Sequence, residues 1–529
     1  GQEGNTHIDS ILLVPLDERP INASYPRLLA GALGWAVSIP TALLGSRKKR
    51  ADSRAVADWL LEQAGTRPLG AVVSLDTLAW GGLIPSRQPG NSLPEALGHL
   101  ETLRQLKRDH PDLRLLAFSS IQRVSRDDDD GEEPDYYRLH GHAIFRRSAF
   151  EHRAAAGALQ AGEAEELERL RQQIPAEVWA DQLAIRQRTA AVNLAALDLV
   201  QDGVLDALVL NQDDTTEWGL NVMHRRRLER EVAHRRLGER VLVYPGADEV
   251  AQALIARLAT QVVGRRPRVS TFWSARRGPE VVTAYEDRPL ADLVGVHLAA
   301  AGAVQVPSGA GPELWLGVNA PSRAQGQGGA AFALAGSHTL SAQEVEWLEA
   351  GEAPVAGLDR SLTAFRATLG ALLDSGARVS LADVAHVNGA DDELMSGLAA
   401  DGALPRLAGY GGWNTAGNAL GSAVALGCLA ALGAASRPLE LAVAARIVDD
   451  WLYQARTRTR LLLRPDLKPL GLGGFVPAAR IGEVEGAARE MVNADLRAHG
   501  LAYELTRLSF PWQRVFEIDY DLRPAGGRA

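Results

Sequence analysis

Two adjacent aspartates, Asp213 and Asp214, are the residues of this sequence best suited by type and position to acid–base chemistry. They follow the apolar run 207–210 and the amides Asn211 and Gln212, and a helical pattern comes next. The apolar run predicts a buried parallel strand, which places the aspartates at its carboxyl end, where α/β proteins keep their active sites. Neighbouring carboxylates repel each other, so the pKa of one rises and the pair can supply one acid and one base.

Glycoside hydrolysis uses this division of labour between two carboxyl groups. Neighbouring residues on an extended backbone point to opposite faces, so the chain must turn after Leu210 for both aspartates to face one site. Aromatic residues near predicted strand ends could form a platform for a sugar ring: Trp80, Trp218, Tyr244, Trp273 and Trp413. The structural alternative for the pair is a helix cap combined with a salt bridge.

Polar residues recur at the ends of other predicted strands, and parallel strands would bring these ends to one rim. We expect them to bind substrate, although capping of the following helices explains part of the pattern. The expected substrate-binding residues are Asp17, Arg19, Asn22, Asp76, Asn211, Tyr244, Asp248, Glu249, Trp413, Asn414 and Asn418.

Three segments have competing interpretations. Arg19 can bind a hydroxyl or carboxylate while Asp17 or Glu18 orients it, or these charges can form a structural ion pair. The glycine-rich segment 411–418 predicts a substrate loop with Asn414 and Asn418 as hydrogen-bond partners, and it lacks the phosphate-loop pattern. The acidic run 127–133 is interpreted as a solvated loop, and a cation site is the alternative.

Alternating strand and helix patterns predict an α/β fold that positions these residues. Eight strands are expected at 11–16, 36–39, 70–75, 113–119, 207–210, 241–244, 269–273 and 314–318. We expect a (β/α)8-like barrel over residues 1–340, with a helical insertion at about 127–203, and a doubly wound open sheet is the alternative. Residues 341–529 are expected to form a mainly helical or α/β region that completes the site, with further strands at 379–384 and 407–410.

Composition narrows the classes of protein to consider. The 529 residues carry a net charge of −9, which argues against nucleic acid as a partner, and 46% hydrophobic content is ordinary for a globular protein. No apolar run reaches the ~18 residues of a membrane span. The single cysteine, Cys428, excludes an internal disulfide. The chain begins with Gly1 and shows no signal peptide, so cytoplasmic residence and export after leader removal both stay open, as does the oligomeric state.

Four motifs together resemble a bacterial family catalogued as domain of unknown function 4127. They are Pro15–Asn22, Asn211–Asp214, Pro245–Glu249 and Gly412–Asn418, and the resemblance extends over about residues 10–522. It implies a bacterial origin and no particular activity. Separately, the Asp-Asp pair is similar to that of O-GlcNAcase-type hexosaminidases, which implies that Asp213 polarises the substrate acetamide and Asp214 is the acid/base.

These observations favour a glycoside hydrolase that acts on a small carbohydrate, such as an N-acetylhexosamine glycoside, without a metal or other cofactor. One alternative is a metal-dependent hydrolase, because Asp17, Asp76, Asp213, Asp214 and Glu249 offer oxygen ligands for Mg²⁺ or Mn²⁺. The other alternative is a carbohydrate-binding protein without catalytic activity.

Overall fold

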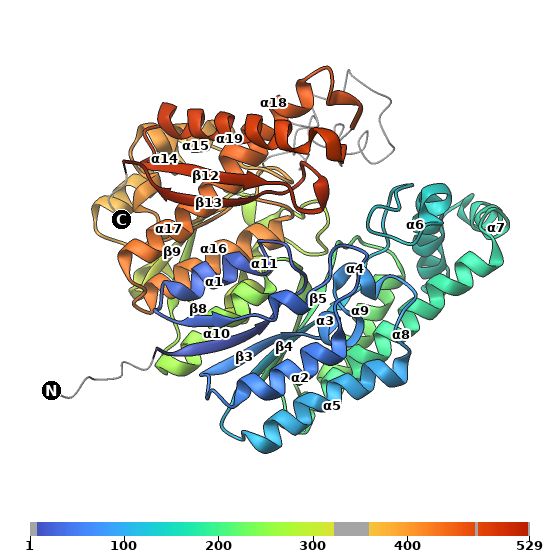
Figure 1. The fold of residues 1–529 in the computed structure, drawn as a ribbon. Helices are drawn as coiled ribbons and strands as arrows, with labels where there is room; N and C mark the ends of the chain where they lie inside the picture. The colour runs from blue at the N-terminus through green and yellow to red at the C-terminus, as the bar shows by residue number, and fades with distance from the viewer. Residues whose placement is uncertain (1–7, 322–358, 471–473, 527–529) are drawn as a thin grey trace. The chain divides into compact units, whose positions relative to one another are not determined.

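A computed structural model describes residues 8–321, 359–470 and 474–526 of the chain (Figure 1). The chain divides into two compact units, and each is built from two separate segments. The first unit combines Gly1–Glu18 with Gly34–Leu258, and the second combines Arg19–Leu33 with Ala259–Ala529. The domain boundary predicted at residue 340 lies outside the described residues. No described helix has both the length and the apolarity needed to cross a membrane.

A six-stranded, all-parallel sheet forms the centre of the first unit, with the order β2-β1-β3-β4-β5-β6. Its strands are β1 (Ser10–Val14), β2 (Ala36–Ser38), β3 (Gly70–Ser74), β4 (Arg114–Ile121), β5 (Ala207–Gln212) and β6 (Val241–Pro245). Because every strand runs the same way, all their carboxyl ends lie at one edge of this sheet. The first five strands follow the order of flavodoxin-like doubly wound sheets.

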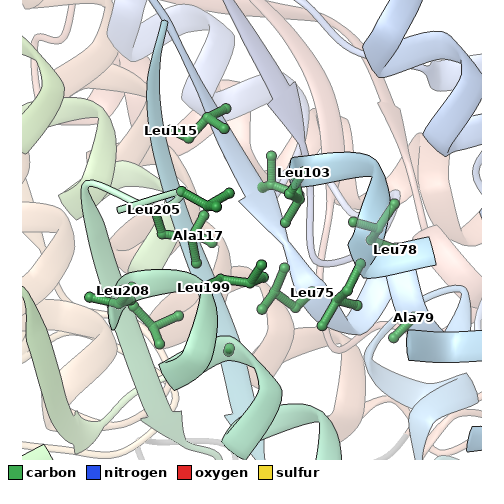
Figure 2. Close-up of a cluster of buried hydrophobic side chains, with 14 of the residues drawn as sticks. Leu75, Leu78, Ala79, Leu103, Leu115, Ala117, Leu199, Leu205 and Leu208 are labelled. Atoms are coloured by element: carbon green, nitrogen blue, oxygen red, sulfur yellow. The ribbon is translucent and has the colours of Figure 1, made fainter. Parts of the chain in front are cut away.

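Helices bury one face of this sheet in a leucine- and alanine-rich core. The face is covered by α2 (Ser53–Ala64), α3 (Leu75–Trp80), α5 (Leu93–Asp109), α8 (Ala176–Gln201) and α9 (Leu220–His234). Figure 2 shows Leu75, Leu103 and Leu199 from three of these helices gathered against Leu115 of β4 and Leu208 of β5. Alternate strand residues point to the same face, which explains why every second strand position contributes to this core.

Three helices follow one another between β4 and β5. They are α6 (Tyr137–Ala155), α7 (Glu163–Gln173) and α8. A second core holds these helices together, with Tyr137, Ile144, Leu167, Leu170 and Trp179 buried in it.

A five-stranded parallel sheet forms the centre of the second unit, with the order β11-β10-β9-β7-β8. Its strands are β7 (Arg268–Trp273), β8 (Val304–Gln305), β9 (Leu314–Asn319), β10 (Val379–Asp383) and β11 (Gly409–Gly411). If these are renumbered from one, the order is again 2-1-3-4-5. The two units therefore repeat one strand order, without a repeat of fixed period in the sequence.

The remaining elements complete the two units. Short helices of the first unit are η1 (Thr41–Leu43) and α4 (Leu83–Ser86), and α10 (Val250–Val263) spans the division between the units. The second unit contains α1 (Ser24–Gly31), η2 (Gly278–Glu280), α11 (Leu290–Ala300), η3 (Ser308–Ala310), α14 (Leu362–Asp374), α15 (Asp392–Ala400), η4 (Leu404–Arg406), α16 (Ala416–Ala431), α17 (Ser436–Arg446), the π-helix η5 (Ile447–Thr457), α18 (Arg458–Leu463), η6 (Lys468–Leu470), η7 (Ala478–Arg480), α19 (Ile481–Ala498) and η8 (Pro511–Gln513), and a hairpin of β12 (Tyr503–Ser509) and β13 (Asp519–Pro524).

The single closed barrel favoured by the sequence is therefore corrected to two open parallel sheets. Among the described strands, β2 and β6 are the edges of the first sheet, and β11 and β8 are the edges of the second. The eight expected strands exist, but six belong to one sheet and two to the other. The strand count could not reveal this, because an alternating pattern does not show which strands pair.

Candidate functional site

The carboxyl ends of β3, β4 and β5 bring several predicted site residues of the first unit together. Asp76 follows β3 and lies in the first turn of α3, whose N-terminus is capped by Ser74. The Asp76 carboxylate accepts hydrogen bonds from the Ser120 backbone N–H at 3.0 Å and from the Gln122 side-chain amide at 3.2 Å. Asp76 thus joins two neighbouring strand ends.

Two arginines and four carboxylates form an ionic lattice beside these strand ends. Glu133 Oε1 accepts from Arg87 Nη1 at 3.1 Å and from Arg123 Nε at 2.8 Å, so it holds the two guanidinium groups next to each other. Arg87 donates to Asp213, and Arg123 donates to Asp214 at 2.9 Å. The fourth carboxylate, Glu132, contacts Arg87 at 3.3 Å and Arg123 at 3.1 Å. We call these six residues the ionic lattice.

The backbone turns sharply at the aspartate pair. Asp214 has a φ of 36°, in the left-handed region that residues with a side chain rarely adopt. This turn supplies the bend that two adjacent carboxylates need in order to face one site. Both aspartates join the same lattice as a result, although successive residues of a strand would point apart. Strained backbone of this kind is concentrated at functional sites.

Burial and charge distinguish the carboxyl groups of the site. The Asp213 side chain is 8% exposed and that of Asp214 is 29% exposed. Burial, together with the neighbouring Asp213 charge, raises the pKa of Asp214 to about 6, although Arg123 acts in the opposite direction. Burial also raises the pKa of Asp76 to about 6, against the effect of its hydrogen bonds with Ser120.

Two amide oxygens at the end of β5 lack a hydrogen-bond donor among the described residues. They are Oδ1 of Asn211 and Oε1 of Gln212, both in nearly fully buried side chains. Asn211 Nδ2 donates to the Gly246 carbonyl at 3.0 Å, and because a carbonyl only accepts, this contact fixes which end of the Asn211 amide is the oxygen. Gln212 Nε2 contacts Thr215 Oγ1 at 2.9 Å, and that hydroxyl group can donate or accept. Unsatisfied buried acceptors are rare in proteins and call for a donor from outside the chain.

The other predicted residues of the first unit lie in or after strands β1 and β6. Asp17 is buried just after β1, and Tyr244 is fully buried in β6, where desolvation raises its pKa. Asp248 and Glu249 follow β6 and are buried as well. Glu249 accepts from the Ala247 backbone N–H at 2.9 Å, and burial raises its pKa to about 8. Glu249 thereby stabilises the turn between β6 and α10.

Five predicted residues belong to the second unit. Arg19 binds Glu517 at 3.3 Å and stacks over Trp512, and the Asn22 backbone N–H donates to the Arg19 carbonyl at 2.9 Å. The Trp413 ring packs against Phe516 with centroids 5.7 Å apart. Asn414 has a φ of 65° and its carbonyl accepts from the Asn388 N–H, while the N–H of Asn418 donates to the Thr415 cap. The predicted set is therefore divided between two units.

Sequence reasoning missed Arg87, Glu132 and Glu133 as members of the site. The acidic run was interpreted as a solvated loop, yet the Glu133 side chain is only 4% exposed. The sequence did contain one indication of this burial. The acidic run ends beside Pro134, Tyr136 and Tyr137, and a charged residue next to such side chains is more readily buried. Arg87 gave no such local signal, because its partner Asp213 is 126 positions away.

The described part of the chain contains no group of three or more His, Cys, Asp or Glu side chains arranged to hold a metal ion. The carboxylates of the ionic lattice are instead bridged by guanidinium groups. The structure therefore gives the metal-dependent alternative no supporting geometry among these residues.

Comparisons with known proteins place the chain in a family. No curated protein and no solved structure matches it significantly. A family model described as a protein of unknown function, DUF4127, matches residues 11–521, in agreement with the motifs at both ends of the chain. The chain belongs to the DUF4127 family of proteins of unknown function.

Proposed function

We propose that this protein is a glycoside hydrolase in which Asp214 is the general acid/base and Asp213 is its ionised partner. The observation that carries the proposal is the different surroundings of two adjacent carboxyl groups in one lattice. Asp213 is the more buried and is bound by Arg87. Asp214 is the more exposed, and its pKa is raised to about 6.

This arrangement suits the substrate-assisted hydrolysis of an N-acetylhexosamine glycoside. Protonated Asp214 gives its proton to the glycosidic oxygen while the bond from that oxygen to the anomeric carbon breaks. The acetamide oxygen of the substrate attacks the anomeric carbon, and the Asp213 carboxylate accepts a hydrogen bond from the acetamide N–H. Water then opens the resulting ring as Asp214 takes a proton from it, which restores both groups.

The surroundings of the pair favour a substrate rich in hydrogen-bond donors. Asn211 presents a buried oxygen without a donor among the described residues, close before the aspartates in the chain. Sugar hydroxyl groups can supply such donors. The ionic lattice carries four carboxylates against two guanidinium groups, so it disfavours phosphorylated or acidic sugars.

A carbohydrate-binding protein without catalysis is the second candidate. It is favoured by the salt bridges themselves, because Arg87 and Arg123 occupy oxygens of both aspartates in the free protein. A catalytic Asp214 must exchange Arg123 for the substrate during turnover. A binding protein would leave both bridges in place.

Turnover of aryl glycosides by the full chain tests these candidates. We expect hydrolysis of aryl N-acetylhexosaminides, and Asp214→Asn should lower kcat about 10²–10⁴-fold by removing the general acid. Asp213→Asn should also lower turnover, whereas Asp202→Asn at an exposed salt bridge is the matched control and should have none of this effect. Undiminished turnover in both site variants would exclude the proposal, and saturable sugar binding without turnover would favour the second candidate.

The pH dependence provides an independent check on the role of Asp214. A general acid must be protonated in the free enzyme, and the protonated fraction falls as the pH rises through its pKa. We therefore expect kcat/KM to decline above a pH of about 6. In Asp214→Asn this limb of the profile should disappear, and its persistence would assign it to another group.

A further inference from the structure

The loop after β11 in the second unit contains buried polar atoms that the protein leaves without partners. The Tyr410 hydroxyl is fully buried, the Trp413 side chain is 5% exposed, and that of Gln454 is 1% exposed. Tyr410 Oη, Trp413 Nε1 and Gln454 Oε1 have no hydrogen-bond partner among the described residues. An orphaned buried polar group costs stability, so three of them in one region call for an explanation.

Gly412 lies beside the Tyr410 hydroxyl group and beside two buried aspartates. Its backbone N–H donates to Asp450 Oδ2 at 2.8 Å. A Cβ atom at position 412 would lie 2.5 Å from Tyr410 Oη and 3.4 Å from Asp383 Cβ. Tyr410, Asp383 and Asp450 therefore surround a position where only glycine leaves room beside the hydroxyl group.

The other two orphaned atoms, Trp413 Nε1 and Gln454 Oε1, belong to residues that both contact Phe516. The Trp413 ring packs against Phe516, and the Phe516 carbonyl accepts from Gln454 Nε2 at 2.8 Å. That contact fixes the direction of the Gln454 amide and leaves its oxygen as the orphaned acceptor. Gln454 and Asp450 both lie in the π-helix η5, and π-helical turns occur frequently at functional sites.

The charged groups linked to this loop are of both signs and pair with one another. Among the described residues, Arg19 and Arg514 pair with Glu517, Arg446 pairs with Asp449 and Asp450, and Arg360 pairs with Asp391. A strongly ionic ligand would compete with these ion pairs in a buried setting. A neutral ligand with both donors and acceptors fits the orphaned hydroxyl, indole N–H and amide oxygen.

We propose that the loop after β11 and the π-helix η5 form a second binding site, which takes a neutral polyhydroxylated ligand such as a sugar ring. Sugar hydroxyl groups both donate and accept, so they can satisfy Tyr410 Oη, Trp413 Nε1 and Gln454 Oε1 together. Tyrosine and tryptophan also offer apolar ring faces to a sugar. Burial raises the pKa values of Asp383 and Asp450 to about 7, so each can donate or accept near neutral pH. The site is independent of the Asp213–Asp214 chemistry in the first unit.

Calorimetric titration of the full chain with monosaccharides tests this site. The probes are glucose, galactose, mannose, xylose and N-acetylglucosamine, with glucuronate and glucosamine as charged counterparts. We expect saturable binding of at least one neutral sugar and weaker binding of the charged ones. Tyr410→Phe should weaken the binding about tenfold through the loss of one hydrogen bond, and Trp413→Phe should do the same. The matched control, Tyr503→Phe, removes a hydroxyl group elsewhere in this unit and should leave affinity unchanged.

Two further measurements distinguish the second site from its alternatives: the Tm of Tyr410→Phe and sugar binding by the first-unit variant Asp214→Asn. Tyr410→Phe should leave the Tm of the free protein unchanged or raise it, because its hydroxyl group has no partner within the protein and an orphaned buried polar group costs stability. A fall in Tm, or the absence of saturable binding by any neutral sugar, would overturn the inference. If Asp214→Asn weakens sugar binding and Tyr410→Phe does not, the sugar binds in the first unit. In that case the second site is wrong and the proposed function still stands.

Discussion

Replacing Arg87 with methionine would remove the cation that holds Asp213 in the ionic lattice. The Arg87 side chain is 4% exposed and reaches Glu132, Glu133 and Asp213. Methionine keeps much of the apolar stem and removes only the charged fork. The variant therefore isolates the ionic contribution from the packing contribution of this residue.

The expected loss of unfolding free energy depends on how many carboxylates would be left without a guanidinium partner. Glu132 and Glu133 keep Arg123 as a partner, so only Asp213 loses its guanidinium contact. Breaking one buried ion pair costs about 3–5 kcal/mol, because a charge stays buried without compensation. Each kcal/mol lowers the Tm of a domain of this size by roughly 2–4 °C, which gives a total fall of about 6–20 °C.

Urea unfolding and thermal unfolding measure this loss, and the transition that shifts identifies the first unit. The matched control is Arg104→Met at the Asp202 salt bridge, whose 26% exposed side chain predicts a cost of about 0.2–1 kcal/mol. Adding Asp213→Asn to Arg87→Met should restore much of the stability, since it removes the orphaned charge. Equal losses for the Arg87 and Arg104 variants would refute the ionic lattice as a buried structure.

Three further outcomes test local features of both units. Ser92→Ala should lower stability by about 1 kcal/mol, because Ser92 caps α5 and exchanges hydrogen bonds with Glu95; unchanged urea unfolding would argue against this cap. Gly246→Ala should lower the Tm, since the new Cβ would lie 1.9 Å from a carboxylate oxygen of Glu249, and an unchanged Tm would mean that Glu249 can move away. Cys428 is buried and its pKa is raised to about 12, so we expect it to react with a thiol reagent only after unfolding, and rapid labelling of the native protein would contradict its burial.

Much of the secondary structure could be predicted from sequence, because buried parallel strands are short apolar runs. The strands at 207–212 and 379–383 illustrate this, since all their residues are buried. The strand β8 was missed, because it has two residues, both exposed, and so carries no apolar signal. The sheet arrangement could not be predicted, since strand pairing depends on contacts between distant residues.

The candidate site shows the same division between local and distant information. The position of Asp213 and Asp214 at a strand end follows from the local pattern, and it was predicted. The pairing of Arg87 with Asp213 depends on the fold that brings residues 126 positions apart together, so it could not be predicted. The second-unit residues Tyr410 and Gln454 carried no signal, because an orphaned polar atom is visible only once its surroundings are known.

The helix α1 has a consequence for how this chain can be made and divided. Residues Arg19–Leu33 are synthesised early, yet they pack in the second unit, where Tyr25 Oη donates to the Ala442 carbonyl and Arg19 pairs with Glu517, 498 positions later. Neither half of the gene therefore encodes a whole unit: a fragment that begins at Gly34 lacks the interior strand β1, and one that begins at Ala259 lacks α1. Contacts of such high sequence separation slow folding, so the nascent second unit stays incomplete until almost the entire chain has left the ribosome.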